Sequence, residues 1–313
     1  MKIVYAGTPQ FAVAPLKAIL DAGWEVTGIV VQPDKPQGRK GILTPAPLKA
    51  FALERGLAVF QPRKLREELP ALKGLGGDVM ITCAYGQILS AETLELFPKG
   101  VWNLHASLLP KYRGASPIQS AVLDGERETG VTVMKTAQGL DTGEILLSER
   151  TEIGGRETFG ELSDRLSLLA ATAVLKALPL IESGKFSLTA QREEGATLTK
   201  KIGKEQARID FALPARRVVD LVRGMNPEPL AYTEADGLRL NVFRAESAPR
   251  PAGTEGAAAG EVLSDSPKAG LIVACGEGEA VRLDEVQAAG GKRMKGSDFL
   301  NGRKVKKGQV FSC

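Results

Sequence analysis

The single histidine of the chain stands in a dense group of polar residues that follows a short apolar run. The run, residues 101–104, predicts a buried strand, and side chains alternate between the two faces of a strand. Asn103 and His105 therefore share one face, and Leu104 takes the other. An amide can donate a hydrogen bond to a developing oxyanion, and an imidazole can move a proton or carry positive charge. A histidine hydrogen-bonded in the core would give the same local pattern, so both readings stay open here.

A second candidate is Asp141, which stands in the glycine-flanked stretch Gly139-Leu140-Asp141-Thr142-Gly143 between two predicted strands. Asp-Thr-Gly also occurs in aspartic proteases, but those need a pair of carboxylates, and this chain has no second copy. A carboxylate that orients a histidine and stabilises its charge is a more natural role. An aspartate in such a loop can also serve only to form the turn.

Other cofactor chemistries are poorly supported by the sequence. The first turn, Gly7-Thr8-Pro9, lacks the further glycines of a dinucleotide fingerprint, and no GxxxxGK[ST] phosphate-binding motif occurs. We therefore expect neither NAD nor ATP as a cofactor. The three cysteines, Cys83, Cys275 and Cys313, are scattered without CxxC spacing, which argues against a disulfide framework or a metal site.

The elements that position these residues alternate between strand and helix over the first part of the chain. Apolar runs at 2–6, 24–31, 78–84 and 101–104 predict buried strands, and 131–135 with 144–150 predict a later strand pair. Apolar periodicity at 10–21 and 159–181 predicts helices. The alternation predicts an α/β domain with a Rossmann-like, mostly parallel sheet, in which ligands bind beyond the carboxyl ends of the strands.

The remainder of the chain has a different pattern. Residues 186–207 are polar with little periodicity, which predicts a linker running over the surface. A predicted helix at 214–223 precedes short strand-like runs at 238–243, 270–274 and 280–283, which indicate a small OB-like β-barrel. We therefore expect a catalytic domain at 1–187, a linker at 188–207 and an OB-like domain at 208–313.

Composition places the chain among ordinary globular proteins. It has 313 residues, 43% hydrophobic and 25% charged, enough for two domains. No apolar run approaches the roughly 20 residues of a membrane span, and the amino terminus reads as a strand rather than a signal peptide. We therefore expect a cytoplasmic protein with no membrane association.

The net charge is only +4, but two stretches carry a local excess of positive charge. Residues 35–49 carry Lys35, Arg39, Lys40 and Lys49 without an acid, in a Pro- and Gly-rich stretch long enough to be a functional loop. From residue 289 to the end there are seven basic residues and one acidic residue, Asp298. Charge runs are usually solvated surface, but two of them beside an OB-like barrel favour contact with a nucleic-acid backbone.

Taken together, the motifs resemble the folate-dependent formyltransferases, and the resemblance runs nearly end to end. It is carried by two elements above all, Asn103-Leu104-His105-Ala106-Ser107-Leu108-Leu109-Pro110 and Gly139-Leu140-Asp141-Thr142-Gly143. It also includes Gly7-Thr8-Pro9, Ala84-Tyr85-Gly86, Tyr112-Arg113-Gly114, Lys201-Ile202-Gly203-Lys204-Glu205 and Ile209-Asp210-Phe211. The stretch 33–39 and the C-terminal domain are similar to the branch that acts on a charged tRNA.

Two departures from the family pattern are visible. Many members read Gly-Arg-Gly in the basic loop, where this chain has Gly38-Arg39-Lys40. Many also read Gly-Ala-Ala-Pro, where it has Gly114-Ala115-Ser116-Pro117. Neither departure touches Asn103, His105 or Asp141.

The resemblance implies a role for each matching residue. Asn103, His105 and Asp141 would form a catalytic trio. Residues Ser107, Leu108, Leu109 and Pro110 would line the folate site, and the backbone of Gln87, Ile88 and Leu89 would meet the pterin ring. The residues expected to contact tRNA are Lys35, Arg39, Lys40, Lys204, Lys292, Arg293, Lys295, Arg303, Lys304, Lys306 and Lys307.

The implied reaction moves the formyl group of 10-formyltetrahydrofolate to the α-amine of methionine on the initiator tRNA. The implied enzyme is a monomer that needs no metal, no protein partner and no covalent intermediate. Asn103 would stabilise the tetrahedral oxyanion, a contribution typically worth about 3–4 kcal/mol. His105 would either stabilise the same oxygen or carry a proton. The alternatives are a formyltransferase acting on a glycinamide ribonucleotide or an amino sugar nucleotide, and a non-catalytic RNA-binding relative.

Overall fold

The computed structural model describes residues 1–37, 41–264, 266–302 and 305–312. Two compact units make up the chain. The first comprises Met1–Pro117, Glu128–Glu152 and Ser163–Lys200, and the second comprises Ile118–Arg127, Ile153–Leu162 and Lys201–Cys313. Two short segments that precede residue 163 thus belong to the second unit, so a single boundary in the linker does not separate the two units.

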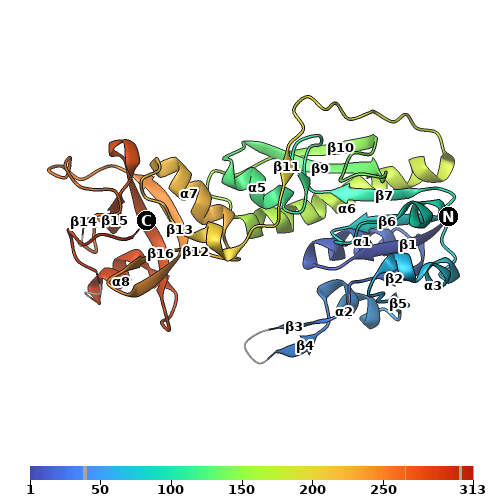
Figure 1. Cartoon of the computed structure of the whole chain (residues 1–313), viewed down its shortest axis with the longest axis horizontal. Helices are drawn as coiled ribbons and strands as arrows, with labels where there is room; N and C mark the ends of the chain where they lie inside the picture. Colours follow the sequence, from blue (N-terminus) through green and yellow to red (C-terminus); the bar gives the residue numbers. More distant parts are fainter. Residues whose placement is uncertain (38–40, 265, 303–304, 313) are drawn as a thin grey trace. The chain divides into compact units, whose positions relative to one another are not determined.

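A seven-stranded sheet forms the centre of the first unit (Figure 1), in the order β10-β9-β7-β6-β1-β2-β5. Its five strands from β7 to β5 pair in parallel. Strand β9 pairs antiparallel with β7 on one side and with β10 on the other. The predicted mostly parallel sheet is therefore confirmed. The strands are β1 (Lys2–Gly7), β2 (Glu25–Val30), β5 (Val59–Phe60), β6 (Val79–Cys83), β7 (Val101–His105), β9 (Glu128–Lys135) and β10 (Ile145–Glu152).

The strand order creates a topological switch between β1 and β6. From β1 the chain builds outward to β2 and β5, and it then returns to the other side of β1 for β6 and β7. In open α/β sheets, ligands bind in the crevice beyond the carboxyl ends of the strands at such a point. The sheet therefore offers a binding position beyond the ends of β1 and β6, beside β7.

Helices pack on both faces of this sheet. On one face, the Tyr5 hydroxyl donates to the carbonyl of Ala12, and the Ser167 hydroxyl donates to that of Phe11. On the other face, the apolar side chains of the strands pack against η2, α3 and α4. The helices and turns of this unit are η1 (Gln10–Ala12), α1 (Val13–Asp21), α2 (Pro47–Glu54), η2 (Leu65–Glu67), α3 (Leu69–Gly74), α4 (Ala91–Glu95) and α6 (Phe159–Ser183) after its first turn. Helix α5 (Pro117–Leu123) belongs, after its first residue, to the second unit.

Among the described residues, α6 is long and apolar enough to cross a membrane by length and composition alone. A helix was expected here, but not one that meets this test. Its buried side chains recur every three to four residues, the spacing of a helix with one face in a core. They are Leu162, Leu166, Ala170, Ala173, Val174, Ala177, Leu178 and Ile181. One helix of this kind is weak evidence for a membrane span, because core helices have the same composition.

The second unit is built on an antiparallel sheet with the path β12-β13-β16-β15-β14, and β17 also pairs with β16. Residues Val310 and Ser312 form bridges with Glu261, beside β14, and with Glu234 of β12. The C-terminal segment therefore meets both edges of the sheet and brings it toward a barrel, as predicted. The strands are β12 (Ala231–Ala235), β13 (Leu238–Ala248), β14 (Val262–Ser264), β15 (Leu271–Ala274), β16 (Ala280–Ala288) and β17 (Met294–Lys295).

Helix α7 (Ala215–Gly224) packs its apolar face on this sheet. Val218 and Val222 lie one helical turn apart, and both join the core that contains Val242 and Phe311. The remaining short elements of the unit are η3 (Lys204–Ala207), η4 (Gly276–Gly278) and α8 (Gly296–Asn301).

The Tyr5 hydroxyl and the neighbouring Cys83 thiol, which can each lose a proton at high pH, are fully buried in the first unit. Burial raises the pKa of the Cys83 thiol to about 12, and burial together with the neighbouring Cys83 raises the pKa of Tyr5 well above its usual value. In an unfolded chain both groups titrate at lower pH. Between the unfolded and folded pKa values the native state binds more protons, so stability falls as pH rises through that range.

We predict that the free energy of unfolding, measured by urea titration, falls progressively from about pH 9 to pH 12 because of these groups. Replacing Cys83 with Ser removes the thiol's share and should flatten the decline. The same decline in the wild type and in Cys83→Ser would contradict the assignment.

Candidate active site

Strand β7 carries two of the three predicted catalytic residues. Asn103 lies in register with Thr82 of β6 on one side and Met134 of β9 on the other, and His105 lies opposite Thr132 of β9. Backbone pairing on both edges fixes the direction in which these side chains leave the sheet. His105 is also the last residue of β7 and therefore stands at the end where ligands bind.

The loop between β9 and β10 brings Asp141 to the same place. Asp141 has a φ of 52°, in the left-handed region that residues other than glycine seldom occupy. Gly143 lets the backbone approach closely, because a Cβ there would lie 1.7 Å from the carbonyl oxygen of Lys135. The glycines noted in the sequence thus permit a tight loop that holds the carboxylate.

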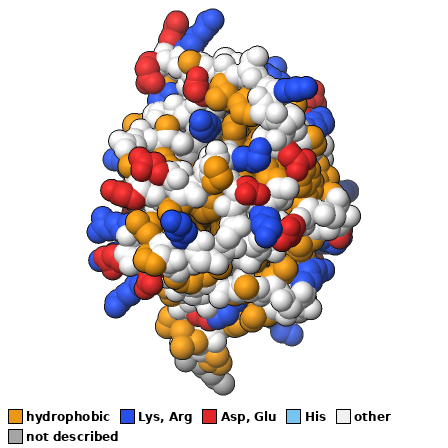
Figure 2. Space-filling model, turned by 90° about the vertical axis from the view of Figure 1, so that its right-hand side faces the viewer, with side chains coloured by type: hydrophobic (Ala, Val, Ile, Leu, Met, Phe, Trp, Pro, Cys, Tyr) orange, Lys and Arg blue, Asp and Glu red, His pale blue; other side chains and the backbone are white. Residues whose placement is uncertain are grey.

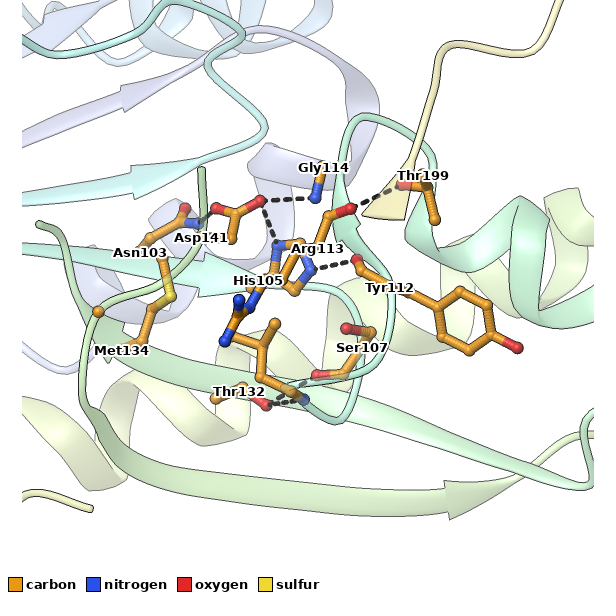
Figure 3. A network of polar contacts seen from close by, with 12 residues as sticks. Asn103, His105, Ser107, Tyr112, Arg113, Gly114, Thr132, Met134, Asp141 and Thr199 are labelled. Atoms are coloured by element: carbon orange, nitrogen blue, oxygen red, sulfur yellow. Dashed lines mark hydrogen bonds and ion pairs between the residues drawn. The ribbon is translucent and has the colours of Figure 1, made fainter. Parts of the chain in front are cut away.

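The Asp141 carboxylate lies between the other two residues of the predicted trio, Asn103 and His105 (Figure 3). Its Oδ2 accepts a hydrogen bond from the backbone N–H of Gly114 at 2.8 Å and lies 3.6 Å from Nδ1 of His105. Its Oδ1 accepts from Nδ2 of Asn103 at 3.4 Å. The structure therefore brings together all three residues that the sequence singled out.

The imidazole of His105 is 5% exposed and has an acceptor at each nitrogen. Nε2 lies 2.9 Å from the carbonyl oxygen of Tyr112, which can only accept, so Nε2 carries a hydrogen. Nδ1 faces the carboxylate of Asp141. Tyr112 and Asp141 thus flank the two ring nitrogens and fix the orientation of the imidazole.

The amide of Asn103 is oriented by Thr82. The Thr82 hydroxyl donates to Oδ1 of Asn103 at 2.9 Å, so the NH₂ group is the end that faces Asp141. Within the described part of the chain, only one of the two N–H groups has a protein acceptor. The other is available to a ligand oxygen.

The turn after β7 is held by its own hydrogen bonds. The Ser107 hydroxyl is fully buried and donates to the carbonyl of Lys111 at 2.7 Å. The Thr132 hydroxyl donates to the Ser107 carbonyl at 2.7 Å and accepts from the N–H of Leu109 at 3.3 Å. Ser107 and Leu109 therefore shape the turn from inside, while Leu108 and Pro110 remain partly exposed.

The predicted pterin-contacting segment follows β6, beside the topological switch. The Gln87 side-chain oxygen accepts from the N–H of Leu65 at 3.0 Å, so this side chain is already used within the protein. Ile88 is 91% exposed. The segment thus offers a flat ring an apolar side chain together with backbone groups for which no hydrogen bond to another described residue occurs. Such a combination fits the pterin of a folate.

The predicted basic loop at 35–49 is only partly a loop. Lys35–Gln37 (β3) and Ile42–Thr44 (β4) form an antiparallel hairpin, and Lys49 lies in α2, where it is paired with Asp34. The structure therefore removes Lys49 from the charge excess. Figure 2 shows hydrophobic side chains at the lower protrusion where the hairpin lies, and Ile42 and Leu43 are exposed there. The predicted Arg39 and Lys40 lie outside the described residues.

The other predicted tRNA contacts differ in how available they are. Arg293 forms an ion pair with Glu285 and stacks over the ring of Phe243, so its charge is largely neutralised. Arg303 and Lys304 lie outside the described residues. The remaining lysines are exposed and have no ion pair with a described residue: Lys35, Lys204, Lys292, Lys295, Lys306 and Lys307.

Sequence reasoning missed residues that hold the trio in place. Thr82 and the backbone of Gly114 contact the trio directly, and Gln191 and Thr199 hold the loops around it. The last two lie in the segment predicted as a surface linker, where the parallel pairing of β11 (Leu198–Thr199) with β8 (Arg113–Gly114) ties it to the turn after β7. Polar, aperiodic sequence looks the same in a solvated linker and in a segment that binds loops.

Comparison with known proteins agrees with this geometry. Residues 1–178 match the formyl transferase family, and residues 201–304 match the formyl transferase C-terminal domain. Methionyl-tRNA formyltransferase of Symbiobacterium thermophilum is 45% identical over 314 residues, which cover 100% of this chain and 95% of the relative.

Solved structures show the same fold at lower identity. WlaRD, a sugar 3N-formyl transferase, was solved in the presence of dTDP and 5-N-formyl-THF. It is 19% identical with a TM-score of 0.67, covering 90% of this chain and 96% of its own. Methionyl-tRNA formyltransferase from Clostridium thermocellum is also 19% identical, with a TM-score of 0.55, covering 79% and 93%. The full-length identity to the curated relative is decisive: the chain belongs to the formyl transferase family, among the methionyl-tRNA formyltransferases.

Proposed function

We propose that Asn103, His105 and Asp141 catalyse transfer of the formyl group from 10-formyltetrahydrofolate to the α-amine of methionyl initiator tRNA. The observation that supports this most is the single carboxylate of Asp141, which meets both the Asn103 amide and the His105 ring at the end of β7. The folate donor supplies the formyl carbon, and the tRNA-linked amine attacks it.

Each residue of the trio has a task in this reaction. Asn103 donates its unused N–H to the oxyanion that forms when the amine adds to the formyl carbon. His105 stabilises the same oxygen, and its ring is held in place by Tyr112 at Nε2 and by Asp141 at Nδ1. The carboxylate of Asp141 orients the ring and offsets positive charge that develops on it during the reaction.

The apolar Ile88 and the backbone of its neighbours receive the pterin, beside the turn at 107–110. The exposed lysines contact the tRNA backbone, Lys35 toward the acceptor end and the others from the second unit. The family resemblance places Arg39 and Lys40 at the acceptor end with Lys35. A cytoplasmic monomer without a protein partner completes the proposal, because both substrates are soluble and each proposed contact comes from one chain. A sugar acceptor is less favoured, since a methionyl-tRNA formyltransferase is 45% identical over the full chain, whereas the sugar formyltransferase is 19% identical.

We expect His105→Ala and Asp141→Asn each to lower kcat for formylation by about 10²–10⁴-fold, because each removes part of the charge stabilisation. Formation of formylmethionyl-tRNA from purified enzyme, formyl donor and charged initiator tRNA measures the effect. Circular dichroism should show an intact fold. Near-normal turnover by either variant would refute the proposed trio.

We expect the double variant Lys292→Gln/Lys295→Gln to bind tRNA more weakly, with a smaller dependence of affinity on salt. Each lost phosphate contact lowers the slope of log K against log salt by about one. Arg293→Gln is the matched control and should change the slope less, because Glu285 already neutralises that guanidinium. An unchanged slope in the double variant would rule out these lysines as contacts.

A further inference from the structure

The segment that leaves the first unit crosses both loops of the active site before it reaches Lys200. Thr189 pairs with Ile145, at the end of the Asp141 loop. Farther on, the Thr197 hydroxyl accepts from the N–H of Tyr112 at 2.7 Å, and the Thr199 hydroxyl donates to the carbonyl of Arg113 at 3.2 Å. The segment therefore contacts the loop that carries Asp141 and the turn that follows His105.

Gln191 is the side chain of this segment that reaches the Asp141 loop itself. Its Nε2 donates to the carbonyl oxygen of Asp141 at 2.8 Å and to that of Gly143 at 2.7 Å. Its Oε1 accepts from Nε of Arg113 at 3.0 Å. One amide thus bridges the two loops and gives both of its N–H groups to carbonyls two residues apart.

Arg113 fixes the orientation of that amide. Arg113 is only 4% exposed, and its two terminal nitrogens donate to the two carboxylate oxygens of Glu193, each at 3.1 Å. A guanidinium can only donate, so the amide oxygen of Gln191 must face it, and the NH₂ group must face the Asp141 loop.

The Asp141 loop needs such an anchor. A residue other than glycine with a φ near 52° is held in a sparsely populated conformation, which persists only where its surroundings determine it. Gly114 holds the carboxylate of Asp141, but Gln191 is the side chain that holds the backbone on both sides of Thr142. Movement of that backbone would carry the carboxylate away from His105.

We propose that Gln191 is a positioning residue for formyl transfer, which acts by locking the Asp141 loop so that the carboxylate meets Asn103 and His105. This inference rests on the proposed role of Asp141. It makes residues 189–199 of the first unit a structural part of the active site, because the bridging amide comes from that segment.

The test replaces Gln191 with Met, which has similar length but makes no such hydrogen bonds. Steady-state formylation should show kcat lowered by about 10–100-fold, as expected for a small misplacement of a reacting group, with KM for both substrates close to wild type. Glu194→Gln is the control, since Glu194 is exposed in the same segment and has no polar contact with any described residue. Its kcat should be unchanged.

A double variant separates positioning from general stability. In single-turnover reactions with excess enzyme, adding Gln191→Met to Asp141→Asn should cause almost no further loss, because the anchored carboxylate is already gone. Gln191→Glu keeps the acceptor for Arg113 but has no N–H to donate. Like Gln191→Met, it should lower kcat and leave KM close to wild type.

Several outcomes would overturn the inference. One is a folded Gln191→Met variant with wild-type kcat. Another is a double variant in which the rate losses of Gln191→Met and Asp141→Asn multiply fully. The third is failure of both Gln191 variants to fold. An active Asp141→Asn would refute the proposed trio itself. An inactive Asp141→Asn beside a normal Gln191→Met would refute only the role of Gln191.

Discussion

The active site depends on one carboxylate held by three different groups. Asp141 accepts from the backbone of Gly114 and from the amide of Asn103, and it faces the imidazole of His105. An anion with little solvent around it is stable only when hydrogen bonds and opposite charge surround it. The same contacts that stabilise the anion therefore fix the two groups that would meet the developing oxyanion.

The fold provides these contacts from distant parts of the chain. The inner strand β7 presents Asn103 and His105, the turn after it presents Gly114, and the β9–β10 loop presents Asp141. Residues of the segment before Lys200 then hold the last two pieces together. The positions are precise because each loop has polar contacts with another element, whereas a free loop would vary by more than the geometry of acyl transfer tolerates.

Periodicity in the sequence predicts most of this framework. The alternation at Asn103, Leu104 and His105 places two functional side chains on one face, and the glycines around Asp141 predict a tight loop. The pairing of the two required the family resemblance, since spacing of residues far apart in sequence does not show that they meet. Apolar runs also located β1, β2 and β6, and β13, β15 and β16 of the second unit, but not β12, β14 or β17.

Other features could not be predicted, for physical reasons. Strands β3 and β4 bury none of their described side chains, and Ile42 and Leu43 are exposed, so no alternation of buried and exposed residues indicates the hairpin. Gln191 and Thr199 form their bonds through polar groups, and polar residues occur equally in solvated linkers. Arg293 differs from the lysines because it pairs with Glu285, which lies eight residues earlier and outside the basic run, and the sequence does not show which basic residue meets it.

The central claim, that His105 and Asp141 act as one unit, is tested most directly by a double-mutant cycle. Single-turnover formylation rates would be measured for His105→Ala, Asp141→Asn and the double variant at saturating donor and tRNA. Residues that act as a unit are strongly non-additive, so we predict a double variant hardly slower than the slower single variant. Losses that multiply would show that the two residues contribute independently and would contradict the account.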